Sequence, residues 1–440
     1  MSIFKACDIR GTYPDQLDET AARAIGRAVG TELDGADCVL AGDVRTSTPA
    51  LKAAALDGLK AAGCHVVDLG IVPTPVAYWA QRTFGTAGAL IVTASHNPPE
   101  YNGIKFMVGD LPVSPADVER VRRRVERGDF RSGAGSVETR DVRSHYLEWL
   151  ASRFGSAAAG LSVVVDAGHG TMSDWAPVAF GRAGCNVVEL FCTPDGRFPD
   201  RSPNPSRPEA LEAAGERVRE TGADVAACFD GDGDRVVFLD EEGEYVPPEE
   251  TLILFVRHLL TEHPGAGVVY DLKCTRTVPR EIKRAGGRPL MERSGHAFIK
   301  RRLLREDALM AGEASGHFFF REIGGDDGLY AALLMAQILA QSDQPLSRMR
   351  SEIGPYFISE DIRIRIPDGD PAAIVSAVKE RFADRPQDHT DGVRVEFEKG
   401  WALCRPSVTE PAVTVRVEGD TPEDLERIRA EVLRAIDAAR

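Results

Sequence analysis

One unit of sequence recurs three times in this chain, and it restricts the fold more than any other feature. In each copy an apolar run reaches an aspartate, a polar turn and a helix follow, the helix stops at an Ala-Gly pair, and a second apolar run begins. The copies start at Val39-Leu40-Ala41-Gly42-Asp43, Val163-Val164-Val165-Asp166 and Val268-Val269-Tyr270-Asp271. Because such strand–helix–strand units cross over to a parallel neighbour, the repeat predicts three related α/β domains with mixed or mostly parallel sheets.

Beyond residue 355 the pattern changes. Residues 362–366, 393–397 and 413–417 alternate apolar and polar side chains, which is typical of an antiparallel sheet with one face in water. A helix with an apolar face begins near Thr421. We therefore predict a smaller C-terminal α+β domain. At the other end, residues 4–11 are predicted to form a short strand.

Composition excludes several classes of function. Lys and Arg total 53 against 68 Asp and Glu, a formal net charge of −15, which argues against broad binding to nucleic acid or anionic membranes. The N-terminus has no apolar signal core, and the longest apolar run, residues 252–256, stops at Arg257. The eight cysteines form no C-x-x-C pair, so neither a zinc site nor a disulfide framework is predicted. We expect a cytoplasmic protein.

Ser95 follows an apolar β-branched run, residues 89–92, and precedes Asn97-Pro98-Pro99. Two prolines cannot extend a ladder, so the serine is expected in a rigid loop at the carboxyl end of a strand. Open α/β sheets bind their ligands there, and an activated hydroxyl can carry a covalent group. The alternative for an isolated Ser-His-Asn-Pro is a serine that only bonds the backbone of its own turn.

Three carboxylates at alternate positions, Asp230, Asp232 and Asp234, follow the apolar run 225–229. With glycines between them they can converge on one hard cation, and Mg²⁺ is favoured because it needs few protein ligands. An EF-hand loop is the rival, but Arg235 occupies the position that requires glycine, and a strand follows where a helix should. A solvated acidic turn is the other alternative.

The stretch Gly312-Glu313-Ala314-Ser315-Gly316-His317 places a carboxylate, a hydroxyl and an imidazole in one loop. Glu and Ser together suit neighbouring hydroxyls of a sugar, although a plain polar turn explains the stretch equally well.

The stretch Arg405-Pro406-Ser407-Val408-Thr409-Glu410-Pro411 combines a guanidinium, two hydroxyls and a turn. These groups suit a phosphate, and the alternative is a hairpin turn stiffened by two prolines. The sequence has neither G-x-x-x-x-G-K-[ST] nor G-x-G-x-x-G, so we expect the phosphate to belong to a substrate or to the protein, and not to ATP or NAD.

Taken together and in this order, the four stretches resemble the α-D-phosphohexomutase family, and the resemblance runs from Asp8-Ile9-Arg10-Gly11 through Arg405. Within the family the chain is most similar to the bacterial phosphomannomutase/phosphoglucomutase branch. Four further segments contribute to that placement: residues 101–105, 271–276, 294–296 and 399–401. The predicted domains 1–140, 141–242, 243–355 and 356–440 would carry, in order, the phosphoserine, metal, sugar and phosphate loops.

The resemblance implies an enzyme that interconverts hexose 1-phosphate and hexose 6-phosphate, of mannose, glucose or both, through a phosphoserine and a hexose 1,6-bisphosphate. Ser95 would carry the phosphate and, with the three aspartates, hold one Mg²⁺. Substrate-binding roles are implied for Arg235, Lys273, Glu313, Ser315, Arg405, Ser407 and Thr409. Charge neutralisation or proton transfer is implied for Arg10, Lys105, His296 and His317. The implied partners are small hexose phosphates, for a monomer or a dimer.

The sequence departs from the family pattern at two positions. Val408 stands where we expect Asn or Gly, so phosphate affinity is in question, and Ala314 stands where the nearest branch usually has Met. Three alternatives stay open: a phosphoglucosamine mutase, a sugar phosphatase that uses the same serine, and a sugar-phosphate-binding protein without activity.

Overall fold

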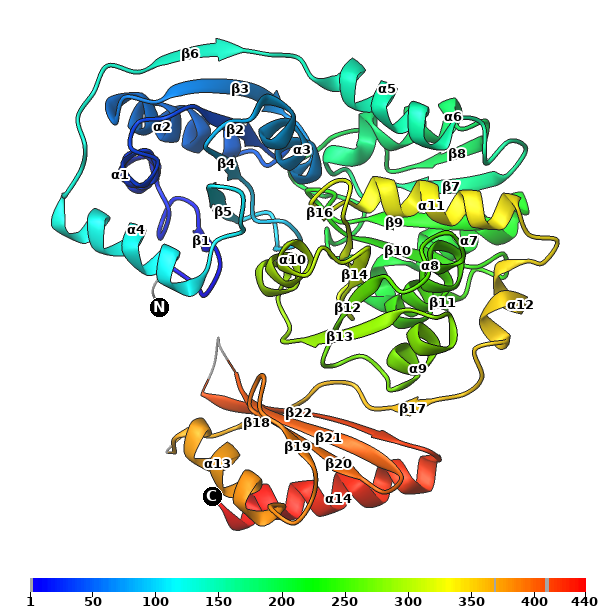
Figure 1. Cartoon of the computed structure of the whole chain (residues 1–440). Coiled ribbons are helices and arrows are strands. Elements are labelled where there is room, and N and C mark those ends of the chain that lie inside the picture. Colours follow the sequence, from blue (N-terminus) through cyan, green and yellow to red (C-terminus); the bar gives the residue numbers. More distant parts are fainter. Residues whose placement is uncertain (1–2, 368, 408–410) are drawn as a thin grey trace.

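The computed structural model describes residues 3–367, 369–407 and 411–440. It contains four sheets along the chain, and Figure 1 shows three of them packed closely together while the fourth stands apart below them. No helix in these ranges is long and apolar enough to span a bilayer. All eight cysteines are free.

The first unit has a six-stranded sheet in the order β1-β5-β4-β2-β3-β6. The four strands β4, β2, β3 and β6 are parallel, whereas β5 is antiparallel to both β4 and β1. The strands are β1 Ile9–Thr12, β2 Cys38–Gly42, β3 His65–Ile71, β4 Gly88–Val92, β5 Tyr101–Val108 and β6 Ser136–Thr139. The helices are α1 Glu19–Glu32, α2 Thr48–Ala61, α3 Thr74–Phe84 and α4 Pro115–Arg127.

The strand predicted over residues 4–11 is wrong in its first half. The backbone N–H of Lys5 donates to the carbonyl of Asp8 at 2.8 Å, which closes a turn, and pairing with β5 starts only at Ile9. The side chains of residues 4–8 did not reveal this turn, because a hydrogen bond between backbone groups closes it.

The second unit has the order β11-β10-β9-β7-β8, with β8, β7 and β9 parallel and the last two strands antiparallel. Its strands are β7 Ser162–Asp166, β8 Asn186–Leu190, β9 Val225–Phe229, β10 Val236–Leu239 and β11 Tyr245–Val246. Its helices are α5 Arg143–Phe154, α6 Ala176–Arg182 and α7 Glu212–Thr221, with short 3₁₀ turns at Thr171–Asp174 and Pro208–Ala210.

The third unit has the order β13-β12-β14-β15-β16, again parallel at first and antiparallel at the end. Its strands are β12 Gly267–Asp271, β13 Arg288–Glu292, β14 Met310–Gly312, β15 Phe318–Phe320 and β16 Gly325–Asp326. Its helices are α8 Pro248–Glu262, α9 Thr277–Arg284, α10 His296–Arg305, α11 Gly328–Ala340 and α12 Leu346–Ser351.

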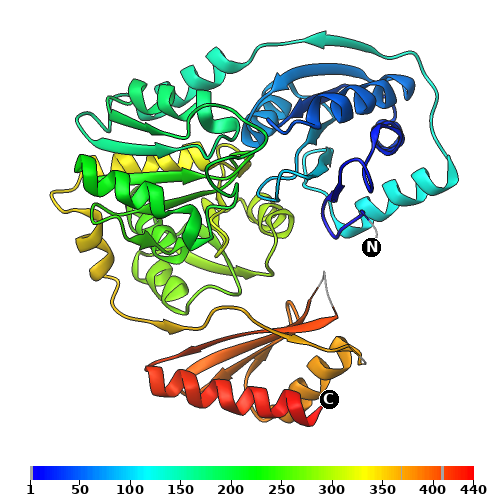
Figure 2. The same ribbon diagram turned by 180° about the vertical axis from the view of Figure 1, so that it is seen from behind.

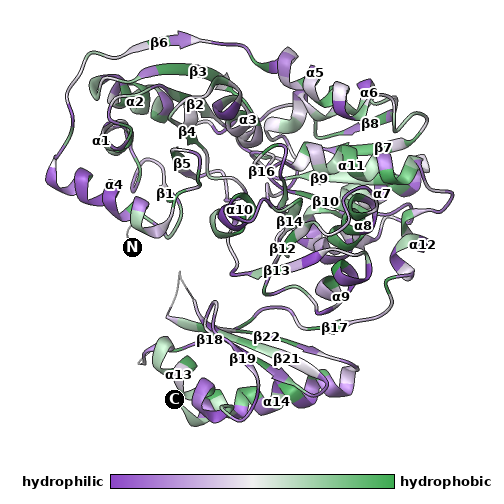
Figure 3. Cartoon of the chain, in the orientation of Figure 1, coloured by the Kyte–Doolittle hydropathy of each residue, from purple (hydrophilic) through white to green (hydrophobic). Residues whose placement is uncertain are grey.

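The sequence repeat corresponds to one parallel strand pair in each unit. Val39 is opposite Val67, Val164 is opposite Val188, and Val269 is opposite Leu290. The predicted fold class is confirmed. One continuous apolar core joins the three units, and the almost wholly buried α11 lies within it. Figure 3 shows the apolar residues gathered on these inner elements, whereas α4 is hydrophilic.

The fourth unit is an antiparallel sheet with two helices and a core of its own. Figure 2 shows both helices on the same face of this sheet. The strands are β17 Phe357–Ile358, β18 Ile362–Arg365, β19 Gln387–Asp388, β20 Val393–Phe397, β21 Gly400–Pro406 and β22 Ala412–Gly419. The helices are α13 Pro371–Arg381 and α14 Pro422–Ala438. The alternating patterns therefore predicted this sheet correctly.

Candidate active site

Ser95 lies in the loop between β4 and β5, in a left-handed backbone conformation with φ of 51°. Non-glycine residues rarely adopt this conformation, so the loop must hold the serine in it. The Ser95 backbone N–H donates to the hydroxyl of Thr93 at 2.9 Å. The guanidinium of the fully buried Arg45 donates to the carbonyls of Ser95 at 2.8 Å and Asn97 at 2.6 Å. These hydrogen bonds fix the backbone of the loop that carries Ser95.

The Ser95 hydroxyl donates to Asp230 Oδ2 at 2.8 Å, across the boundary between the first and second units. Its other polar neighbour is His96 Nδ1 at 3.2 Å. Because Ser95 is only 2% exposed, its hydroxyl lies between protein groups and away from bulk water. The loop of Gly231 and the loop of Ser95 lie close together, because a Cβ on Gly231 would be 2.6 Å from the Ser95 carbonyl oxygen.

The three aspartates between β9 and β10 are buried and converge, with one carboxylate oxygen from each within 4.8 Å of the others. Asp232 Oδ2 accepts from Thr74 at 2.7 Å and from Thr93 at 3.1 Å. Asp232 Oδ1 is buried without a hydrogen-bond partner among the described residues, and Asp234 Oδ1 has only the His317 ring nitrogen at 3.4 Å nearby. Buried carboxylate oxygens of this kind need a cation, and this donor set fits Mg²⁺.

Lys105 neutralises part of the negative charge of the three aspartates. Its ammonium contacts Asp232 Oδ2 at 2.8 Å and Asp234 Oδ2 at 2.5 Å. Burial acts to lower the pKa of Lys105, but the two carboxylates raise it well above its usual value. Burial and the other two aspartates raise the pKa of Asp230 well above its ordinary range. The ammonium of Lys105 therefore offsets only part of the charge of the three buried carboxylates.

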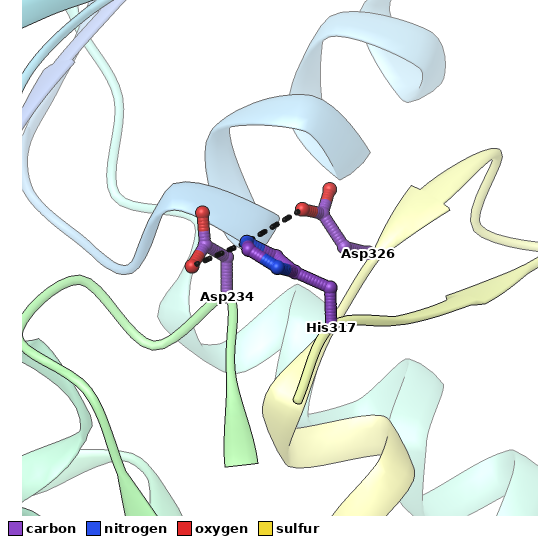
Figure 4. A group of neighbouring side chains, drawn as sticks. All are labelled: Asp234, His317 and Asp326. Atoms are coloured by element: carbon purple, nitrogen blue, oxygen red, sulfur yellow. Dashed lines mark ion pairs between the residues drawn. The ribbon is translucent and has the colours of Figure 1, made fainter. Parts of the chain in front are cut away.

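His317 lies between the three aspartates and the residues Glu313 and Ser315. Its Nε2 lies 3.4 Å from Asp234 Oδ1 and 3.8 Å from Asp326 Oδ2, the arrangement drawn in Figure 4. Its Nδ1 lies 3.2 Å from Glu313 Oε2 and 2.9 Å from the Ser315 hydroxyl. Burial and the nearby Arg235 act to lower its pKa, but the carboxylates raise the pKa of His317 to about 9.

A protonated His317 has a consequence for metal binding. Asp234, His317 and Asp326 also lie close enough to ligate a cation. However, an imidazolium cannot be a ligand, and its charge already offsets these carboxylates. Of the two groups, the three aspartates of the β9–β10 loop are therefore the better candidate for a metal site.

A pocket of about 560 Å³ opens beside the aspartates, between the second, third and fourth units. Seven of the residues predicted from sequence line it: Arg235, Lys273, His296, Glu313, Ser315, His317 and Arg405. Two other predicted residues lie outside the pocket lining. Lys105 contacts Asp232 and Asp234, and Arg10 donates a hydrogen bond to Asn97 Oδ1 at 2.7 Å beside the Ser95 loop. The pocket adjoins the aspartates through Arg235, whose Nε lies 3.9 Å from Asp230 Oδ2.

Arginines outnumber carboxylates on the side of the pocket formed by the fourth unit, where Asp361 also lies and Arg416 pairs with Glu249 at 3.0 Å. Arg363, Arg405 and Arg416 line it, and Arg405 Nη1 donates to Asp391 at 3.1 Å. Val408 and Thr409, which the sequence placed in a phosphate loop, lie outside the described residues. An anion bound here would face three guanidinium groups, which is suitable for a phosphate.

Sequence reasoning missed four residues of this site: Arg45, Asp326, Arg363 and Arg416. Arg45 follows the first repeat strand by three residues, and Asp326 follows the sugar loop in a Gly-Gly-Asp-Asp run, so both positions carried a weak signal. Arg363 and Arg416 belong to alternating strands, where an arginine normally faces water.

Comparison with known proteins gives a consistent result over the whole chain. Four family models match in order, described as phosphoglucomutase/phosphomannomutase alpha/beta/alpha domains I, II and III and the C-terminal domain. They match residues 1–132, 144–243, 247–356 and 362–435. A phosphomannomutase/phosphoglucomutase from Pseudomonas aeruginosa is 38% identical over 100% of this chain and 96% of its own length.

Comparison with solved structures also finds matches over nearly the whole chain. The crystal structure of a phosphoglucomutase/phosphomannomutase family protein from Burkholderia thailandensis is 36% identical, with a TM-score of 0.93 over 99% of this chain and 97% of that one. An Aspergillus fumigatus N-acetylphosphoglucosamine mutase, solved with GlcNAc-6P and magnesium, has a TM-score of 0.62 over 98% of this chain and 95% of that one. At 14% identity the second likeness concerns the fold alone.

Proposed function

The chain belongs to the phosphoglucomutase/phosphomannomutase family of α-D-phosphohexomutases, whose members are intramolecular phosphotransferases, and on this premise we propose that Ser95 carries the transferred phosphate. The observation that supports this assignment is the hydrogen bond of 2.8 Å that the Ser95 hydroxyl donates to Asp230, which belongs to the group of three converging carboxylates. The substrates of this proposal are the 1- and 6-phosphates of mannose and glucose.

In the first half-reaction the bond between phosphorus and Ser95 Oγ breaks, and a bond forms between phosphorus and the free hydroxyl of a hexose phosphate. The hydroxyl gives up its proton, and Ser95 Oγ takes one up as it becomes a hydroxyl again. Asp230, Asp232 and Asp234 would hold Mg²⁺, which supplies positive charge beside the transferring group when bound. His296 lines the pocket, and burial lowers its pKa to about 4. It is therefore neutral near pH 7 and can accept the proton of the attacking hydroxyl.

The second half-reaction requires the bisphosphate to turn end for end. Arg363, Arg405 and Arg416 would bind whichever phosphate is not reacting, because they present charge and no group that reads a ring position. The Ser315 hydroxyl lies 3.4 Å from Glu313 Oε2. These two side chains would bind neighbouring hydroxyls of the sugar in either orientation of the bisphosphate. Neither feature requires a particular configuration at C2, so both epimers are accepted in this proposal.

The test is turnover of the Ser95→Ala variant with Mg²⁺, a trace of glucose 1,6-bisphosphate, and glucose 1-phosphate or mannose 1-phosphate, followed by phosphorus NMR. We expect the wild type to form the 6-phosphates without free phosphate, and Ser95→Ala to be inactive. Ser376→Ala, which removes an exposed helix hydroxyl, is the matched control and should be fully active. Normal turnover by Ser95→Ala contradicts the assignment, and release of free phosphate by the wild type indicates a phosphatase.

A further inference from the structure

A second pocket lies away from the catalytic groups, between the first and third units. It has a volume of about 490 Å³, within the usual range for a small-ligand site. Its walls come from α3, from β5 and the loop after it, from α10 and from the loop at Gly324. None of the residues implicated above in catalysis lines it.

The pocket contains a buried cation without a counterion at contact distance. Lys300 is 2% exposed, and its ammonium lies 3.6 Å from the centre of the Tyr78 ring and 3.5 Å from Met107 Sδ. Within the described ranges no carboxylate oxygen comes within 4.0 Å of it. A ring face and a sulfur replace only part of the hydration that a buried ammonium loses. Accordingly, burial lowers the pKa of Lys300 to about 8, although the charge of Asp326 acts in the opposite direction.

A second cation faces the same space. The Arg82 guanidinium lies against Gly324, where a Cβ would be 2.5 Å from its central carbon. Across the part of the chain that the structure describes, this guanidinium forms no hydrogen bond or ion pair, and its charge acts to lower the pKa of Lys300. Arg82 is exposed, so water can hydrate its charge, whereas the ammonium of Lys300 is buried. An anion in the pocket would meet both cations and would replace the hydration that Lys300 lacks.

Other groups in the pocket fit the rest of a small ligand. The Gln81 side-chain oxygen is buried without a hydrogen-bond partner among the described residues, so it can accept from a ligand hydroxyl. Tyr78, Met107 and Leu304 supply an apolar wall, and the exposed Asp110 stands at the rim.

We propose that this pocket, lined by Arg82, Lys300 and Gln81, is a second and non-catalytic binding site for a small hydroxylated phosphomonoester. Lys300 supplies a point charge, Arg82 a planar fork for two phosphate oxygens, and Gln81 an acceptor for the hydroxyl. The helices that form it also reach the catalytic groups. Thr74 at the start of α3 bonds to Asp232, and His296 at the start of α10 lines the catalytic pocket.

The test uses the full chain labelled with [¹³C-methyl]methionine and titrated with glycerol 3-phosphate. The chain has only seven methionines, and Met107 lies in the proposed site, whereas Met172 lies against Gly233 of the aspartate loop. Met107→Leu identifies the Met107 signal. We expect that signal to shift saturably in the wild type.

In Arg82→Ala the apparent affinity read at Met107 should fall roughly tenfold or more, the loss expected for a charge-assisted hydrogen bond. Arg127→Ala, which removes an exposed cation at the end of α4, should leave the affinity unchanged. Lys300→Leu is a second variant with the same expected loss. If the Met107 signal does not shift in the wild type, or if Arg82→Ala and Lys300→Leu both keep the wild-type affinity, the proposal is wrong. Because this readout needs no turnover, it is independent of Ser95.

Discussion

The shape of the Ser95 loop depends on one buried guanidinium, that of Arg45. It donates to four backbone carbonyls of the loop, those of Ser95, Asn97, Pro98 and Tyr101, and it pairs with Asp43. A side chain with five fixed donors can satisfy such a set, whereas the ammonium of a lysine cannot. We therefore regard Arg45 as the residue that positions the proposed phosphoserine.

Arg45→Met should lower stability by about 3 kcal/mol or more, because it leaves the Asp43 charge and the loop carbonyls buried without their partner. It should also lower kcat, since Ser95 loses its fixed orientation. Denaturant unfolding and steady-state kinetics measure both effects. Arg23→Met breaks an exposed pair with Asp57, whose side chain is 51% exposed, and should cost less than about 1 kcal/mol. Equal losses in the two variants would contradict this role of Arg45.

Asp327 makes stability dependent on pH. Burial raises its pKa to about 7, although it caps α11 and accepts from the Tyr146 hydroxyl. Because the folded-state pKa exceeds the unfolded value of about 4, the folded state favours the protonated carboxyl. The contribution of the protonated carboxyl to the free energy of unfolding is therefore complete below about pH 4 and is lost as the pH rises through about 7.

Asp327→Asn removes the titration and keeps an acceptor for the helix cap. The difference in Tm between the variant and the wild type should therefore shift in favour of the variant between pH 5 and pH 8. Thermal unfolding at the two pH values measures it. A difference in Tm that does not change with pH would show that Asp327 ionises normally in the folded protein.

At the scale of elements, the site depends on how closely the β9–β10 loop approaches the β4–β5 loop. Gly231 is the contact point, because a Cβ there would meet the Ser95 carbonyl at 2.6 Å. Both partners are backbone and cannot move aside. Gly231→Ala should therefore reduce kcat by about a hundredfold, as expected when catalytic groups are displaced by about 1 Å.

The control for this prediction is Gly181→Ala in α6, where an added Cβ has open space. Alanine favours a helix over glycine by up to about 1 kcal/mol, so this variant should be as stable as the wild type or more stable, with unchanged kcat. Wild-type activity in Gly231→Ala would show that the two loops need not meet as closely as they do here.

The elements were largely predictable from sequence, whereas the contacts between them were not. Val39, Val164 and Val269 each belong to a local pattern that a strand–helix–strand unit imposes, so periodicity was sufficient. Arg45 joins two loops of the first unit, and Asp326 lies beside Asp234 of the second unit. Arg416 departs from the polar-outward rule because its strand faces a pocket. Their roles depend on which surfaces meet, and no local pattern encodes this. The predicted domain boundaries and the roles of the site residues stay predictions.

At the scale of the whole molecule, the fourth unit is held to the third through Glu418. This buried carboxylate accepts from the Thr275 hydroxyl at 2.8 Å, the Arg276 backbone N–H at 2.9 Å and the Trp401 indole at 2.5 Å. The fourth unit also contributes the guanidinium groups of Arg405 and Arg416 to the catalytic pocket. The junction thus controls where the non-reacting phosphate would bind.

Glu418→Ala should loosen this junction and raise KM by more than it lowers kcat, because substrate binding depends on the position of the fourth unit. Limited proteolysis should also cut residues 352–356 faster than in the wild type. Glu423→Ala, in the exposed first turn of α14, should change neither quantity. An unchanged KM in Glu418→Ala would contradict the role assigned to the junction.

The central claim is that Ser95 passes its phosphate to a sugar, and a single-turnover experiment tests it most directly. The protein is first labelled with ³²P from labelled glucose 1,6-bisphosphate, and the labelled peptide is identified by mass spectrometry. Excess glucose 1-phosphate is then added with Mg²⁺. We expect the label on Ser95 and its transfer to a hexose bisphosphate. A label on another residue, or its release as free phosphate when the sugar is added, would contradict the claim.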